Sequence, residues 1–249
     1  MHTRGFKLFL VIAVLACAAL LKFRSASQQP FLPASALPDQ FITVLGIAQD
    51  AGYPQIGCDK ECCKAFWKGK KEKKLVTCLA LVDRPAGKYW LFEATPDITT
   101  QLSNLQQFLP ASPDYRPDGV FLTHAHIGHY TGLMQFGREA MGAAGIPVYA
   151  MPRMDSFLRN NGPWSQLVEL KNIELRTMKE DSNVGLSSGL TIRPWRVPHR
   201  DEYSETCGFV ISNGARKMLF IPDIDKWEKW DRDILSLVKD FSVVLIDGT

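Results

Sequence analysis

Three histidines within a six-residue stretch constrain this chain more than any other feature of its sequence. His124, His126 and His129 follow the apolar run 119–122 and precede a segment, 132–136, with helical spacing. The apolar run has the character of a buried strand, and the spacing after it favours a helix. The histidines are therefore predicted on a loop at the carboxyl end of a strand, where open α/β folds place their chemistry.

The spacing of these histidines predicts a metal site. On an extended backbone His124 and His126 project to the same side, and His129 follows on the first helical turn. Neutral imidazole is a common protein ligand for zinc and similar ions near neutral pH. Three solvated histidines at a strand end are the weaker interpretation, because the chain has only five histidines in total.

The pattern His-x-His-x-Gly-His after an apolar strand resembles the His-x-His-x-Asp-His motif of the metallo-β-lactamase superfamily. Further stretches resemble its branch of proteins similar to PqqB, the pyrroloquinoline-quinone biosynthesis protein B: 45–55, 93–97, 197–200, 221–223 and 247–249. Together they cover the chain from about residue 41 to its end. The resemblance implies an α/β (α+β) fold, the metallo-β-lactamase αββα sandwich, and a metal-dependent hydrolase.

The resemblance also implies a ligand set. His199 and Asp223 each follow an apolar strand, and with His124, His126 and His129 they are expected to bind one or two Zn²⁺ ions, with Fe or Mn as alternatives. We expect the catalytic roles to fall to His199 and Asp223, the latter orienting water or taking its proton. A competing role for Asp223 is the N-cap of a following helix. The motif at 93–97 is expected to support the metal loop through hydrogen bonds.

Two departures from the family pattern bear on the second metal ion. Gly128 stands where the superfamily has an aspartate, so that site lacks an oxygen ligand. No histidine follows His199, and the sequence stops at 247–249, directly after an apolar run. We therefore expect the C-terminal part of the domain to be truncated, with its last ligand missing.

Cys58, Cys62 and Cys63 form a second cluster of candidate ligands. Thiolates at this spacing can hold a structural zinc ion, which PqqB-like proteins carry near this point. A disulfide, favoured in an exported protein, and free thiols are the alternatives. A fourth ligand is not evident, and Cys78 qualifies only if the fold brings it close.

Candidate substrate contacts are Tyr130 and Arg200, which lie beside the ligands, and Asp50, whose loop borders the active-site cleft in the family resemblance. The expected substrate is a small molecule from the superfamily range of phosphodiesters, thioesters, lactones and β-lactams. A net charge of +3 is too small to indicate a nucleic-acid partner. The lysines of 64–74 are expected to form a solvated face. The oligomeric state is not predicted.

The N-terminus has the pattern of an export signal. Arg4 and Lys7 precede an apolar run, 8–21, that is short for a membrane span. Cys17 lies in a sequence that resembles a lipoprotein box, so a lipid anchor is the alternative. We expect an exported protein, periplasmic or membrane-anchored facing the periplasm. The predicted parts are a signal peptide or anchor at 1–24, a linker at 25–40 and the metallo-β-lactamase-like domain at 41–249.

Two other functions compete with the hydrolase: an iron-dependent oxidative enzyme acting on a quinone precursor, and a non-catalytic metal- or ligand-binding protein. With 46% hydrophobic residues the chain can bury the core of one domain. Its apolar patterns predict helices at 99–108 and 226–239, and strands at 41–45, 77–83, 89–93, 119–122, 147–150, 173–176, 190–197, 208–212, 218–221 and 242–246, the last one buried.

Overall fold

The computed structural model describes residues 37–109, 115–187 and 189–248. Contacts divide the chain into two units, Met1–Leu37 and Pro38–Thr249, and nearly all described residues belong to the second. The predicted signal or anchor at 1–24 lies outside the described residues, as does most of the linker. In the part that the structure describes, no helix is long and apolar enough to cross a membrane.

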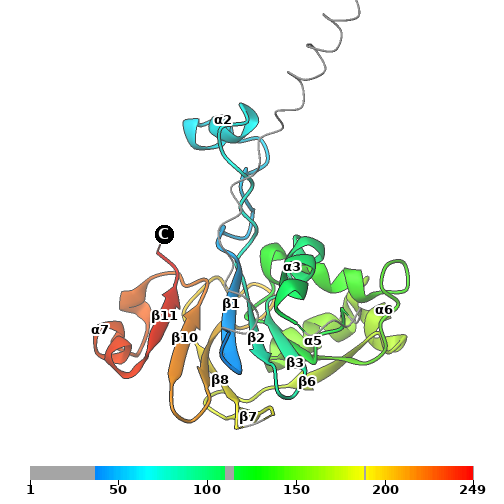
Figure 1. Cartoon of the computed structure of the whole chain (residues 1–249), viewed down its shortest axis with the longest axis vertical. Coiled ribbons are helices and arrows are strands. Elements are labelled where there is room, and N and C mark those ends of the chain that lie inside the picture. Colours follow the sequence, from blue (N-terminus) through cyan, green and yellow to red (C-terminus); the bar gives the residue numbers. More distant parts are fainter. Residues whose placement is uncertain (1–36, 110–114, 188, 249) are drawn as a thin grey trace, which may run out of the picture. The chain divides into compact units, whose positions relative to one another are not determined.

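The first sheet contains six strands in chain order (Figure 1). They are β1 (Gln40–Gly46), β2 (Cys78–Asp83), β3 (Lys88–Phe92), β4 (Gly119–Phe121), β5 (Ile146–Ala150) and β6 (Ile173–Thr177). Strands β1 to β3 pair antiparallel, whereas β3 to β6 pair in parallel. Parallel neighbours need crossover connections, which carry the helices. These are α3 (Ile98–Leu105), η2 (Gln106–Phe108), α4 (Ile127–Tyr130), η3 (Thr131–Phe136), α5 (Pro152–Asn160) and α6 (Trp164–Glu169).

The second sheet has the order β11-β10-β9-β8-β7. Its strands are β7 (Val184–Gly185), β8 (Thr191–Arg196), β9 (Cys207–Ser212), β10 (Lys217–Ile221) and β11 (Val243–Ile246). All neighbours pair antiparallel except β10 and β11, which are parallel. The connection between these two strands carries three short helical turns: η4 (Trp227–Lys229), α7 (Ile234–Leu237) and η5 (Val238–Asp240).

Side-chain alternation along β2 shows how the layers pack. Its residues are all buried, but Cys78, Ala80 and Val82 join the core under the helices, whereas Leu79 and Leu81 join the core between the sheets. This follows from the two-residue period of a strand. A third core lies between the second sheet and the helical turns after β10. The layers are therefore helix, sheet, sheet and helix, which confirms the predicted αββα sandwich.

Phenylalanine rings fill the space between the sheets. Phe92 lies 5.2 Å from Phe121 of its own sheet, and 5.5 Å and 6.2 Å from Phe209 and Phe220 of the other, measured between ring centroids. Phe92, Phe121 and Phe209 are fully buried. This aromatic packing fixes the position of one sheet against the other, and with it the loops at the ends of their strands.

Two predicted elements differ from the structure. The helix expected at 226–239 is wrong: Trp230 is extended, donates from Nε1 to the Arg196 carbonyl at 2.7 Å, and ends the first turn. Asp233 then caps a new short helix by accepting from the Leu235 amide at 3.1 Å. The strand β11 is not buried as predicted, because it forms the edge of its sheet and leaves Val243 49% exposed.

Candidate metal centre

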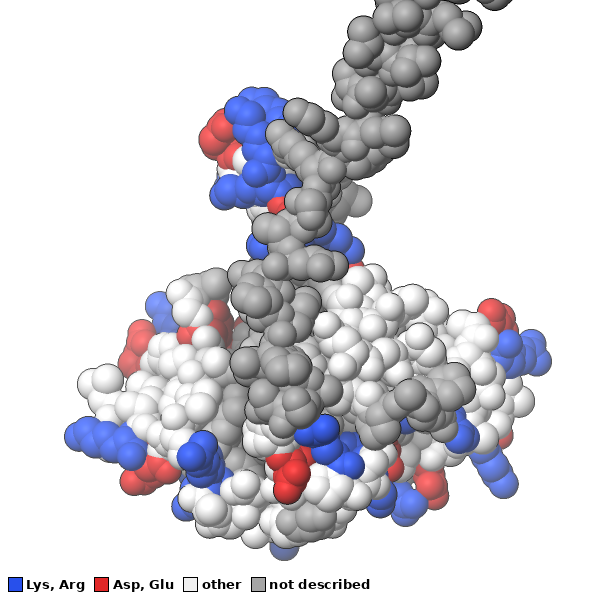
Figure 2. All heavy atoms as spheres, viewed as in Figure 1, with Lys and Arg blue, Asp and Glu red and all other residues white. Residues whose placement is uncertain are grey.

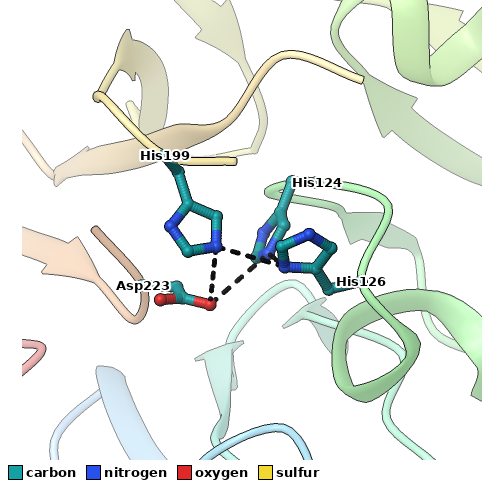
Figure 3. A group of neighbouring side chains, drawn as sticks. All are labelled: His124, His126, His199 and Asp223. Atoms are coloured by element: carbon teal, nitrogen blue, oxygen red, sulfur yellow. Dashed lines mark hydrogen bonds and ion pairs between the residues drawn. The ribbon is translucent and has the colours of Figure 1, made fainter. Parts of the chain in front are cut away.

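Four side chains converge at one end of the sandwich, where three strands of the two sheets finish (Figure 3). His124 and His126 lie on the loop after β4 of the first sheet, as the sequence predicted. His199 follows β8 and Asp223 follows β10, both in the second sheet. One potential ligand atom from each side chain lies within 4.8 Å of all the others. The aromatic core between the sheets holds the ends of their strands, and hence these loops, next to one another.

The distances between the four groups fit a metal ion. His126 Nδ1 lies 2.9 Å from His124 Nε2 and 3.1 Å from His199 Nε2. Asp223 Oδ2 lies 3.2 Å from His199 Nε2 and 3.5 Å from His124 Nε2. Three imidazole nitrogens facing one another beside a carboxylate form a donor set that suits Zn²⁺, and also Fe²⁺. Asp223 therefore belongs to this cluster, and the structure gives it no N-cap role.

The electrostatics keep the donors in the forms that bind metals. Burial, together with the charge of His129, lowers the pKa of His124 to about 3, so its ring is neutral at pH 7. Burial alone would raise the pKa of Asp223, but hydrogen bonds from His124 and His199 lower it below its usual range. A neutral imidazole and an ionised carboxylate are the ligand forms that a divalent ion requires.

Two neighbours orient the rings of the cluster from outside. Thr123 Oγ1 lies 2.9 Å from His124 Nδ1, and Glu202 Oε2 lies 3.0 Å from His126 Nε2. His124 and His126 are thus each hydrogen-bonded at the nitrogen that faces away from the cluster, and the other nitrogen of each ring is left to bind a metal ion. Sequence reasoning did not identify Glu202. Its only signal was a place in the charged turn after His199.

His129 lies next to the four-residue cluster but is not part of it. Its Nε2 is 3.8 Å from Asp223 Oδ2, and its Nδ1 is 3.3 Å from Glu93 Oε1. His129 is 1% exposed and Glu93 is fully buried. Burial alone would lower the pKa of His129, but the carboxylates of Glu93, Asp223 and Asp50 raise it. Glu93 thus lies beside the His129 ring on the side away from Asp223. The family resemblance implied such a supporting role for the motif at 93–97.

A cavity of about 750 Å³ opens beside the cluster. Asp50, His129, His199, Arg200 and Asp223 line it, together with residues at the carboxyl ends of β1 and β11. Two of the three predicted substrate contacts, Asp50 and Arg200, thus border a space that a small molecule can enter.

The third predicted substrate contact, Tyr130, does not line this cavity. It is 5% exposed and packs against Phe157 and Trp164, with ring centroids 5.6 Å and 4.8 Å away. The side chain points from α4 into the core under the helices. Proximity to His129 in the sequence suggested a substrate contact, but the helical turn directs Tyr130 to the opposite side.

Cys58, Cys62 and Cys63 come together around α2 (Glu61–Trp67) as free thiols. Their sulfur atoms lie within 4.8 Å of one another, and Cys62 Sγ is 3.9 Å from Cys63 Sγ. Three converging thiols suit a zinc ion with an open fourth position. Cys78 lies in the core at β2 and does not join them.

The lysines that follow this cysteine cluster are exposed. Figure 2 shows basic side chains gathered over α2 and the turn after it. Lys64, Lys68 and the four lysines of 70–74 all reach solvent. This is the solvated face that the sequence predicted.

Comparison with known proteins gives one family. Residues 89–249 match the model of the β-lactamase superfamily domain. Coenzyme PQQ synthesis protein B from Nitrosococcus oceani is 26% identical over 232 residues, which cover 84% of this chain and 73% of the relative. The same protein from Methylobacillus flagellatus is 27% identical with the same coverage.

Solved structures agree on the fold. The crystal structure of Zn²⁺-bound PqqB from Methylobacterium extorquens matches with a TM-score of 0.70 and 22% identity, over 84% of this chain and 72% of that chain. A diphosphatase from the PhnP family matches with a TM-score of 0.51 and 23% identity, over 72% of this chain and 63% of that chain. At these identities the likeness concerns the fold alone.

Proposed function

This chain belongs to the β-lactamase superfamily, and we propose that it is a metal-dependent hydrolase. The proposed metal ligands are His124, His126, His199 and Asp223. The observation that carries the proposal is the convergence of four donor atoms from two sheets beside an open cavity. Three histidine ligands are the arrangement in which catalytic zinc keeps a fourth position for water, and His199 and Asp223 line the cavity. An ion that also bound Asp223 would have to become five-coordinate to bind that water.

Zinc is the ion that we propose for this cluster. Its ligands are commonly imidazole nitrogen and carboxylate oxygen, and a similar fold binds zinc in PqqB from Methylobacterium extorquens. When bound, a divalent ion supplies water with a pKa near 7 and polarises a substrate oxygen. That chemistry suits hydrolysis of an ester, phosphodiester or lactone bond.

The protein's own residues have separate tasks in this proposal. Asp223 is ionised, its side chain is 24% exposed and it lines the cavity, so it can accept a hydrogen bond from the attacking water and orient it. His199 is the proposed histidine ligand that lines the cavity, so an ion bound to it would face the substrate. Arg200 lies at the cavity wall with its side chain 65% exposed and offers a guanidinium to an anionic substrate.

An iron-dependent oxidative enzyme is the second candidate, because 84% of the chain is similar to the coenzyme PQQ synthesis proteins B. Three histidines and a carboxylate also suit Fe²⁺. Export to the periplasm, with or without a membrane anchor, stays a prediction from the sequence. The absence of a nucleic-acid partner likewise stays a prediction.

The test is metal content followed by turnover. The full chain is purified, its metals are measured by elemental analysis, and hydrolysis of bis(p-nitrophenyl) phosphate and p-nitrophenyl esters is followed. The variant His124→Ala/His126→Ala removes two ligands, and Glu228→Ala, an exposed glutamate outside the site, is the control.

We expect the wild type and the control to contain zinc and to turn over a substrate, and the double variant to contain less zinc and to lose turnover. Zinc content that is unchanged in the double variant would place the metal on Cys58, Cys62 and Cys63 instead. Iron in the wild type would favour the oxidative enzyme. A wild type without metal would refute the proposed function.

A further inference from the structure

The segment between β1 and β2 carries a lobe that stands off from the sandwich (Figure 1). We call residues 56–74, which include α2, the α2 lobe. None of its residues belongs to the three hydrophobic cores. The two chain segments that lead to it are joined by isolated bridges between Ala48 and Val76 and between Tyr53 and Lys74. The lobe can therefore meet an outside surface without any change in the packing of the sheets.

The α2 lobe concentrates positive charge on an otherwise acidic domain. Its seven lysines stand against three acidic residues, a net charge of +4. Residues 37–55 and 75–249 have 18 basic and 23 acidic residues, a net charge of −5. A negatively charged surface would therefore attract the lobe and repel the sandwich.

The lysines of the lobe are available to such a surface. All seven are exposed, and Figure 2 shows them around α2. They are Lys60, Lys64, Lys68, Lys70, Lys71, Lys73 and Lys74. Lys73 pairs with Asp97 of the sandwich, whereas the other six form no salt bridge within the described part of the chain.

Two large apolar side chains of the same lobe are left in solvent. Trp67 is 67% exposed, the only exposed tryptophan among the described residues, and Ile56 is 94% exposed. Phe66 packs against Trp67 and Tyr53, with ring centroids 4.9 Å and 6.3 Å away. Of the residues of α2 only Cys63 is buried. The lobe thus has no core that could take Trp67 and Ile56 out of water, and an apolar partner would.

Lysines beside exposed tryptophan and isoleucine fit the surface of an anionic lipid membrane. Each lysine near an anionic leaflet adds to the attraction. Tryptophan favours the membrane–water interface, because its ring is apolar and its N–H can reach water. Ile56 gains by leaving water for lipid, whereas an aliphatic side chain offers a nucleic acid no ring on which a base can stack. The export signal or anchor predicted at 1–24 would bring the chain to a membrane, which agrees with this choice.

We propose that the α2 lobe docks this protein on an anionic membrane surface. The lysines contact the lipid phosphates, and Trp67 and Ile56 enter the interface beside them. No residue of the lobe lines the cavity next to the histidine cluster, so the docking site is separate from the metal centre. The inference does not depend on the hydrolase function.

The test measures the tryptophan fluorescence of the full chain with vesicles of equal parts phosphatidylglycerol and brominated phosphatidylcholine. Bromine on the acyl chains quenches a tryptophan that enters the lipid, and the same vesicles without bromine give the reference. The apolar run 8–21 contains no tryptophan, so vesicle binding through that run alone leaves the fluorescence unquenched. We expect quenching on these vesicles and little on brominated phosphatidylcholine alone, because the lysines need anionic headgroups.

Two tryptophan variants identify the reporter. Trp67→Phe is expected to lose most of the quenching, because the exposed tryptophan is then absent. Trp227→Phe, which changes a partly buried tryptophan of the sandwich, is the control and is expected to keep it.

Two lysine variants test the charge. Lys64→Gln/Lys68→Gln/Lys71→Gln is expected to raise the lipid concentration for half-maximal quenching at least about tenfold. Lys88→Gln/Lys179→Gln/Lys239→Gln removes the same charge from exposed positions of the sandwich and is expected to match wild type. Circular dichroism shows whether each variant is folded.

Four results would overturn the proposal: a wild type that is not quenched, equal quenching on phosphatidylcholine alone, unchanged quenching in Trp67→Phe, and a wild-type response in the folded lysine variant of the lobe. An oligonucleotide that binds a wild type unquenched by lipid would make the lobe a nucleic-acid surface instead. None of these results bears on the metal centre, so the proposed function is tested separately.

Discussion

Glu202→Ala removes a side chain that touches the metal centre only from outside. Glu202 lies 3.0 Å from His126 Nε2 and holds that ring with Nδ1 toward the cluster. Without it, His126 can adopt the tautomer that protonates Nδ1, and the ring is free to turn. Zinc binding must then restore the orientation, which weakens the affinity without removing a ligand.

The size of the effect follows from the exposure of Glu202. Loss of a partner behind a histidine ligand typically costs 10–100-fold in metal affinity. Because the Glu202 side chain is 48% exposed, water can replace part of its hydrogen bond, so we expect the lower end of that range. A tenfold loss corresponds to about 1.4 kcal/mol of binding free energy.

The assay is a zinc competition titration against a chromophoric chelator at fixed pH and salt. Glu228→Ala serves as the control, because Glu228 is exposed and lies outside the site. Glu202→Gln, which keeps a hydrogen-bond acceptor, is expected to lose less affinity than Glu202→Ala. A folded Glu202→Ala variant with the affinity of wild type would refute the view that Glu202 orients His126.

Three further predictions follow. Phe92→Ala is expected to lower the free energy of unfolding by about 3–5 kcal/mol, since this buried ring contacts both sheets. Denaturant unfolding measures the change, and a loss below about 1 kcal/mol would contradict the packing argument. Iodoacetamide near pH 8 is expected to label Cys58 before Cys78, because a hydrogen bond from Cys63 lowers the pKa of Cys58 whereas burial raises the pKa of Cys78. Peptide mass spectrometry measures the order of labelling, and labelling of Cys78 first would contradict the prediction. In metal-free protein the native state protonates His124 only near pH 3, whereas the unfolded chain does so near about 6.5. His124 therefore contributes more stability at pH 7 than at pH 5, whereas His129, whose pKa is raised in the native state, acts in the opposite sense. The urea midpoint of wild type is expected to fall more from pH 7 to pH 5 than that of His124→Gln, and an equal or smaller fall would refute this.

Local patterns predicted most strands and the loop that carries His124 and His126, whereas the αββα layers and the inclusion of His199 and Asp223 followed from the family resemblance. The apolar runs of β2 and β4 identify strands by themselves, and strand ends identify the loops after them. The helix expected at 226–239 failed for a tertiary reason. Its apolar spacing is real, but Trp230 reaches the Arg196 carbonyl only if the helix is interrupted.

The remaining site features depend on contacts between distant segments. Glu202 meets His126 across 76 positions of the chain, and no spacing rule connects them. Gly128 read alone indicated a lost oxygen ligand. The structure shows instead that the glycine accommodates Asp50, a residue from a loop before β2. Such a pair becomes visible only when the backbone is folded.

The division of the ligands between the two sheets has a mechanical consequence. His124 and His126 follow a strand of the first sheet, whereas His199 and Asp223 follow strands of the second. An ion bound to all four would cross-link the sheets at one edge of the sandwich, and neither half could retain it alone. A ligand present at 1,000 times its dissociation constant stabilises the native state by about 4.1 kcal/mol. Removal of the ion by a chelator would therefore loosen this end of the sandwich first. Amide hydrogen exchange would rise at the ends of β4, β8 and β10 before it rises in the aromatic core between the sheets.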